Sequence, residues 1–142
     1  MLPLRYARHW QLASVILLLL VLIAALMPAA VWFWTDDVPV VEWLKHVDKW
    51  AHGLTFVVLS VWFCGQYRRA NYWRVAVGLI AFGVLIELLQ GLLSYRMAEW
   101  FDLVADAIGI AVGMWLAIAW FGEWCLRFEE WQMARARSSG DA

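Results

Sequence analysis

Residues 10–34 read WQLASVILLLLVLIAALMPAAVWFW and contain no Asp, Glu, Lys or Arg. An α-helix rises about 1.5 Å per residue, so about 20 apolar residues cross the hydrocarbon core of a bilayer. The stretch is long enough to do so and predicts a membrane-spanning helix. It is also much longer than the roughly 7–15 apolar residues of a secretory signal core, which favours a retained helix over a cleaved leader.

Three further apolar runs follow at 50–67, 73–93 and 101–122, and short polar connections separate them. Each run has about the length that a transmembrane helix needs. A soluble helical bundle would instead need polar faces that recur about every 3.6 residues, and a segment such as 108–121 has none. We therefore expect an all-α fold, an integral membrane four-helix bundle that forms a single domain over residues 1–142.

The composition supports this class of protein. Hydrophobic residues make up 65% of the chain and the mean hydropathy is +0.67, whereas soluble domains contain about 45–50% apolar residues. The net charge of −1 gives no indication of a nucleic-acid partner. The two cysteines, Cys64 and Cys125, do not make a disulfide framework, and we expect free thiols.

The sequence also predicts the structure of two segments outside the apolar runs. Residues 35–47 contain Pro39 followed by regularly spaced apolar side chains, which predicts a short interfacial helix in the first outer connection. Residues 123–142 are amphipathic at first and end in a Ser-Ser-Gly sequence before Asp141. We expect this second segment to be a flexible cytoplasmic tail.

The distribution of Lys and Arg predicts the orientation, because the cytoplasmic ends of membrane segments are enriched in these residues. With four spans, eight of the 11 fall on one side only if both termini are cytoplasmic. These eight are Arg5, Arg8, Arg68, Arg69, Arg74, Arg127, Arg135 and Arg137, and the other side holds Lys45, Lys49 and Arg96. We therefore expect both termini in the cytoplasm.

Ionisable residues occur in three of the predicted spans at a similar depth below the outer boundary. His52, Glu87 and Asp106 each lie on the order of 5–10 Å inside it, at about 1.5 Å per residue. Charged groups in a bilayer normally face the bundle interior or a water-filled cavity, because exposing them to lipid is costly. The shared depth therefore predicts a polar pocket that opens to the outer side.

Helical spacing refines this pocket. Three pairs of candidates are three or four residues apart, which places both members of a pair on one helix face. The pairs are Asp48 with His52, Glu87 with Gln90, and Asp102 with Asp106. The pocket candidates are Asp48, Lys49, His52, Glu87, Gln90, Arg96, Asp102 and Asp106. Gly109 and Gly113 continue the stripe of Asp106, so we expect this face to pack closely against a neighbouring helix.

The surplus of carboxylates over cations in this set has more than one interpretation. The carboxyl groups have raised pKa values, a cation binds among them, or both. The candidate metal ligands are His52, Glu87, Asp102 and Asp106. Their oxygens suit Mg²⁺ or Ca²⁺, and the histidine favours Zn²⁺ or Mn²⁺. In the simplest alternative, these side chains only lock the helices together through hydrogen bonds.

The same motifs resemble those of the VanZ-like membrane protein family. The matching pieces are Asp48-Lys49-Trp50-Ala51-His52 with Phe56, then Glu87-Leu88-Leu89-Gln90, then Arg96, Asp102, Asp106, Gly109 and Gly113 in this order. The resemblance therefore covers the chain from about Asp48 to Gly113. The family usually shows an asparagine at the position of Asp106, so this chain has an additional acidic group there.

The resemblance implies a multi-pass protein of the bacterial cytoplasmic membrane with a role at the cell envelope. The family takes its name from a protein linked to resistance against the lipoglycopeptide teicoplanin. Our leading hypothesis is that the outer pocket binds a phosphate- or glycan-bearing lipid, such as an envelope lipid precursor, or a lipoglycopeptide, with membrane lipids as further partners. Lys49 and Arg96 would contact phosphate, and the carboxylates would accept hydrogen bonds from sugar hydroxyls or bind a cation.

The alternative is a metal-assisted hydrolase or transferase that acts on a lipid-linked envelope substrate. In that hypothesis Asp48 and His52 form a base and its orienting partner, and the other carboxylates surround a metal. Ser94 is the nearby hydroxyl that this hypothesis would test. Ion or proton movement across the bundle is a weaker hypothesis, because the inner halves of the later spans show no comparable polar residues.

Overall fold

The computed structural model describes residues 2–27, 41–93 and 100–140, and the side chains of 2–27, 50–93 and 101–137. All regular secondary structure in these ranges is helical. The elements are α1 (Ala7–Leu26), α3 (Val41–Cys64), the 3-10 turn η1 (Arg69–Asn71), α4 (Tyr72–Gly91), α5 (Trp100–Leu116), the π-helical turn η2 (Ala117–Phe121) and α6 (Trp124–Gly140).

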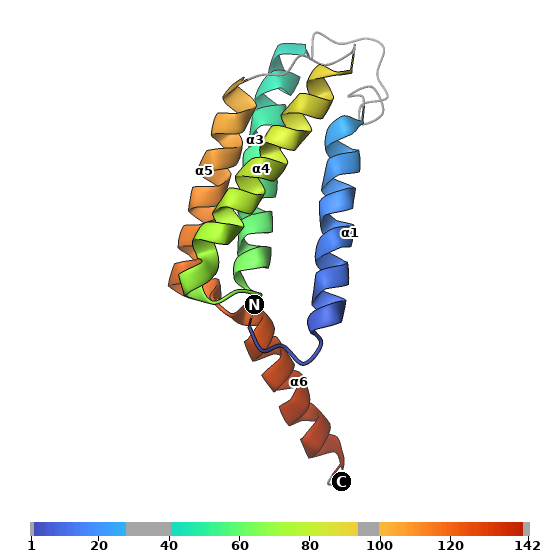
Figure 1. Cartoon of the computed structure of the whole chain (residues 1–142), viewed down its shortest axis with the longest axis vertical. Coiled ribbons are helices and arrows are strands. Elements are labelled where there is room, and N and C mark those ends of the chain that lie inside the picture. The colour runs from blue at the N-terminus through green and yellow to red at the C-terminus, as the bar shows by residue number, and fades with distance from the viewer. Residues whose placement is uncertain (1, 28–40, 94–99, 141–142) are drawn as a thin grey trace.

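The helices form a bundle with one projecting element. α3, α4 and α5 lie side by side, and α1 stands beside them in contact with α4 (Figure 1). The starts of α3 and α5 and the ends of α1 and α4 lie together at one end, which we call the polar end (Figure 1). α4 begins at the opposite end, after Arg68 and Arg69, and α6 extends away from there (Figure 1). We call it the arginine end.

The apolar character of these helices suits a membrane. Three helical stretches of the described chain are long and apolar enough to cross a bilayer: Ala7–Leu26, Arg69–Gly91 and Phe101–Arg137. The apolar part of α3, Trp50–Cys64, is shorter. Side chains such as Leu19 on α1 remain exposed, which is the expected arrangement where lipid rather than water is the surrounding solvent.

The helices lie where the apolar runs predict them, but some of their bounds differ. α4 and α5 begin one residue before the predicted starts at 73 and 101, whereas α1 covers only the first part of 10–34, whose last seven residues lie outside the described part. The interfacial helix is not a separate element. Its residues from Val41 onward belong to α3, since no Gly or Pro interrupts the sequence before Gly53.

Close packing between α3 and α5 confirms the glycine prediction. A Cβ on Gly109 would collide with the backbone carbonyl of Gly53, and a Cβ on Gly113 would meet the backbone of Val57. Small residues at this spacing let two membrane helices approach until their backbones touch. Phe56 is buried within this interface. The α3–α5 contact therefore fixes the geometry of everything attached to these two helices.

A sharp break separates α5 from α6. After η2 the chain passes through Gly122 and then Glu123, which has a φ of 59° in the left-handed region. Arg127 Nη2 donates hydrogen bonds to the carbonyl oxygens of Trp120, at 3.1 Å, and Gly122, at 2.8 Å. These bonds satisfy carbonyls that the helix end leaves without intrahelical partners. The break ends the helical stretch of α5 and η2 at Phe121 and redirects the chain into α6.

The expectation of a flexible tail is wrong, because α6 continues to Gly140. The sequence from Trp124 to Arg137 is free of Gly and Pro and rich in residues with good helix propensity. α6 also packs against the start of the chain through buried Cys125 and the partly buried Trp124 and Leu126, which contact Leu2 and Leu4. This packing supplies the stabilisation that a solvated tail would lack.

Candidate functional site

Five buried polar side chains gather at the polar end, and we call them the polar cluster. They come from three helices: His52 from α3, Glu87 and Gln90 from α4, and Asp102 and Asp106 from α5. Each is at most 8% exposed although the surrounding helices are apolar. The prediction that these residues turn inward rather than toward lipid is therefore confirmed for all five.

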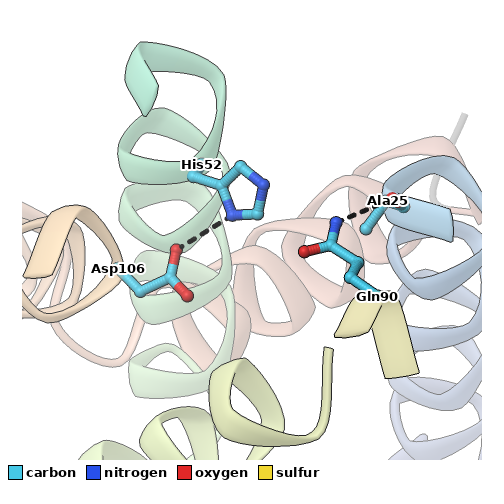
Figure 2. Close-up of polar contacts among 4 residues, drawn as sticks. All are labelled: Ala25, His52, Gln90 and Asp106. Carbon is cyan, nitrogen blue, oxygen red and sulfur yellow. Dashed lines mark hydrogen bonds and ion pairs between the residues drawn. The ribbon is translucent and has the colours of Figure 1, made fainter. Parts of the chain in front are cut away.

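A close contact between His52 and Asp106 links α3 to α5 inside the polar cluster. His52 Nδ1 lies 3.3 Å from Asp106 Oδ1, and the two side chains point toward one another (Figure 2). The second carboxylate oxygen, Oδ2, lies against Gly83 of α4, where a Cβ would come within 2.7 Å of it. Gly83 thus makes room for the carboxylate, and Oδ2 accepts no hydrogen bond from the described residues.

α1 is joined to the polar cluster through Gln90 of α4. Its Nε2 donates a 2.9 Å hydrogen bond to the carbonyl oxygen of Ala25 in the last turn of α1 (Figure 2). The last four carbonyls of a helix have no intrahelical partner, so this acceptor is available. Sequence reasoning missed Ala25, because a backbone carbonyl leaves no trace in residue type. The sequence did indicate the donor of this bond, because Gln90 lies three residues after Glu87 and shares its helix face.

Some predicted site residues lie beyond what the structure describes. Arg96 and Ser94 fall outside the described residues, and for Asp48 and Lys49 only the backbone is described. Asp48 lies one helical turn before His52 on α3, as its spacing requires. The outer pocket itself, and the places of these residues in it, stay predictions.

The four candidate metal ligands do not form a metal centre by themselves. Within residues 2–27, 50–93 and 101–137, no three His, Cys, Asp or Glu side chains lie close enough together to hold an ion. His52 and Asp106 approach each other, but Glu87 and Asp102 do not complete a coordination group with them. A cation here would need ligands from elsewhere, such as the phosphate oxygens of a bound molecule.

A second polar group, near the arginine end, was not predicted. The Ser14 hydroxyl accepts hydrogen bonds from Gln66 Nε2, at 2.9 Å, and from Trp62 Nε1, at 3.0 Å, and donates one to the carbonyl of Trp10, at 2.8 Å. Ser14 and Gln66 are both buried. Ser14 lies on α1 and Trp62 on α3, so this group joins these two helices near one end, while Gln90 joins α1 to α4 near the other.

Glu129 of α6 forms a third buried polar contact, which we call the Glu129 clamp. Its carboxylate accepts hydrogen bonds from the backbone N–H groups of Arg5, at 2.8 Å, and Tyr6, at 3.1 Å, and from Trp10 Nε1, at 2.8 Å. Burial by itself would raise the pKa of Glu129, but these hydrogen bonds and the charge of Arg5 leave its pKa below the ordinary value. The clamp fastens α6 to the start of α1.

Comparison with known proteins identifies the family of this chain. The VanZ/LLP1 family model matches residues 4–122. The chain belongs to the VanZ/LLP1 family. A search of curated proteins and a search of solved structures each found no match.

The VanZ/LLP1 match encloses the whole polar cluster and stops at the break after η2, at Gly122. Family membership together with the apolar helices makes this a membrane protein of VanZ type. α6 and its Glu129 clamp lie beyond the matched residues.

Proposed function

We propose that this VanZ-family protein binds a phosphate- or glycan-bearing lipid, or a lipoglycopeptide, through the polar cluster at the bacterial cell envelope. The observation that carries the proposal is the burial of five polar side chains from three helices at one end of an apolar bundle. Polar and ionisable groups inside a membrane are expensive, and they generally mark binding sites or transport pathways.

The chemistry of the polar cluster suits such ligands. Carboxylates of Glu87, Asp102 and Asp106 accept hydrogen bonds from sugar hydroxyls, and protonated His52 donates to phosphate. Lys49 and Arg96 would add a point charge and a planar guanidinium for the same phosphate. A divalent cation would bind between the carboxylates and the ligand's phosphate oxygens, as Mg²⁺ commonly does in phosphate sites.

The proposal includes a topology. Four crossings of the bacterial inner membrane with both termini in the cytoplasm would place the polar end outside, within reach of envelope lipids. In support, Arg68 and Arg69 lie at the opposite end, where α6 also begins (Figure 1). Cytoplasmic ends of membrane segments carry an excess of such residues.

The test compares wild type with Glu87→Gln, which keeps the size of the side chain and removes its charge. The full chain would be purified in detergent and titrated with teicoplanin and, separately, with a polyprenyl phosphate. We expect a melting temperature that is unchanged or higher, because one buried charge is lost, and affinity lower by about tenfold or more. Glu130→Gln is the matched control, since Glu130 is exposed on α6. Equal affinity in wild type and Glu87→Gln would leave helix packing as the role of Glu87.

A hydrolase or transferase of lipid-linked substrates is the second candidate. The contact between His52 and Asp106 favours it, since a carboxylate beside an imidazole can orient the ring and stabilise its protonated form in general acid–base catalysis. This candidate requires turnover. Incubation of the purified protein with a polyprenyl diphosphate and Mg²⁺ should release phosphate in wild type and none in His52→Ala, and release by neither protein would exclude this reaction.

A further inference from the structure

We propose that a groove between the N-terminal segment and α6 binds the phosphate headgroup of an anionic membrane lipid. The groove has a volume of about 240 Å³ and is lined by Arg5, Met133, Ala136 and Arg137. We call it the arginine groove. It is separate from the polar cluster and lies at the other end of the bundle (Figure 1), so the proposal does not depend on the function proposed above.

The lining of the arginine groove has the chemistry of a phosphate site. Two guanidinium groups come from segments far apart in the sequence, and none of the four lining residues is acidic. A guanidinium presents a planar set of donors that matches phosphate oxygens. Two such cations facing one groove repel each other, and an anion bound between them relieves that repulsion. Met133 and Ala136 supply apolar surface beside the charges.

The Glu129 clamp builds this groove. Met133 lies four residues after Glu129, and Ala136 and Arg137 lie three and four residues after Met133, so the four share the face of α6 that meets the N-terminal segment. Because Glu129 accepts a hydrogen bond from the backbone N–H of Arg5, it fixes the backbone from which the Arg5 side chain extends over the groove. The site is therefore positioned by a buried contact rather than by two mobile surface chains.

The opposite face of α6 favours a lipid over a soluble anion. Phe128 and Trp131 are exposed and stack with ring centroids 6.1 Å apart, and the Arg135 guanidinium lies 5.4 Å from the centroid of Trp131. Exposed aromatic rings beside arginines are typical of the membrane–water interface. At the arginine end Trp120 is also exposed, just before the break that leads into α6. These side chains indicate that α6 lies at the membrane–water interface, where the nearest anions are lipid headgroups.

Native mass spectrometry of the full-length protein, purified with phosphatidylglycerol and phosphatidylcholine present together, tests this proposal. Wild type should retain phosphatidylglycerol in preference to phosphatidylcholine. Arg5→Gln combined with Arg137→Gln should reduce that preference about tenfold. Arg8→Gln combined with Arg74→Gln removes the same charge outside the groove and should leave the preference unchanged. Glu129→Gln retains both groove arginines but weakens the clamp, and it should reduce the preference about threefold.

Three outcomes would overturn the proposal. Equal losses in the groove and control double variants would show only a general attraction of anionic lipid to cationic surface. Displacement of the lipid by excess inorganic phosphate would assign the groove to a soluble anion. An unchanged preference in the Arg5 and Arg137 double variant would mean that the groove binds no lipid.

Discussion

Nδ1 of His52 lies 3.3 Å from Oδ1 of Asp106, beside a point where α3 and α5 pack closely against each other. His52 is the neighbour of Gly53 in the chain, and Gly53 meets Gly109, which lies one helical turn after Asp106. The contact between the two ionisable groups is therefore held by backbone packing beside it. A change in that packing should act on the polar cluster without altering any of its side chains.

The first prediction is that substitutions of His52 and Asp106 have different effects on ligand binding. Asp106→Asn restores the residue that the resemblance assigns to the VanZ-like family and keeps an oxygen facing His52, so melting temperature and ligand affinity should stay close to those of wild type. His52→Ala removes the imidazole and should abolish measurable binding at normal protein abundance. Thermal melting and titration with teicoplanin or polyprenyl phosphate would check both variants. Strong binding by His52→Ala would contradict a role for the imidazole.

The glycines of α5 give a second prediction. Gly109→Ala would push a methyl group into the backbone carbonyl of Gly53, so the helices must separate, at a cost of about 1–3 kcal/mol. Gly78→Ala is the matched control, because a Cβ at Gly78 meets nothing within 4 Å and alanine favours the helix by about 0.5–1 kcal/mol. The melting temperature should fall for the first variant and hold or rise for the second. A Gly109→Ala protein as stable as wild type would show that α3 and α5 are not packed this tightly.

The sequence allowed good prediction wherever a property depends on residue type and spacing. Apolar runs located α4 and α5 to within one residue at their starts, because membrane solubility depends on composition and length. Spacing placed Glu87 and Gln90 on one face, and both are buried. The glycine stripe predicted a close helix contact for the same reason, since a missing Cβ is visible in the sequence.

Prediction failed where tertiary contacts decide the structure. The polar pattern of residues 124–140 suggested a solvated tail, yet Glu129 is buried because backbone N–H groups of Arg5 and Tyr6 reach it from the other end of the chain. Backbone donors have no residue-type signature, and their partners are more than a hundred residues away. The same reasoning applies to Ala25, whose carbonyl accepts from Gln90.

The proposed topology gives a third prediction. Fusion of a reporter that is active only in the cytoplasm should give signal after Ala142, and a reporter active only in the periplasm should give signal when inserted after Ser94. The expected pattern follows from the excess of arginines at the end of the bundle where α6 begins. A periplasmic C-terminus would reverse the bundle and place the polar cluster on the cytoplasmic side.

The cysteines supply a fourth prediction. Cys64 and Cys125 are free thiols, and both have 0% exposed surface. A maleimide should therefore label neither in the native protein and both after denaturation, without prior reduction, because no disulfide has to be broken. Cys64→Ser should reach normal abundance and bind ligand normally, since Cys64 is not part of the polar cluster. Labelling that needs a reductant would contradict the unpaired state.

The Glu129 clamp should make the stability of the protein depend on pH. Three donors contact one buried carboxylate, so Glu129→Gln should lower the free energy of unfolding at neutral pH by about 2–4 kcal/mol. The pKa of Glu129 is lower in the folded protein than its ordinary value of 4.5. The ionised carboxylate is therefore the form that folding favours, and its contribution is present above that ordinary value and is lost as the pH falls through the lowered pKa.

Melting temperatures of wild type and Glu129→Gln, recorded from neutral pH downward, would check this dependence. The difference between the two proteins should be greatest at neutral pH. It should shrink as the pH falls from about 4.5 through the lowered pKa, because Glu129 becomes protonated first in the unfolded protein and then in the folded one. Glu130→Gln is the control, since the exposed Glu130 should give a curve that follows wild type throughout. If the difference for Glu129→Gln stayed constant across this range, the charge of Glu129 would not be what fastens α6 to the start of the chain.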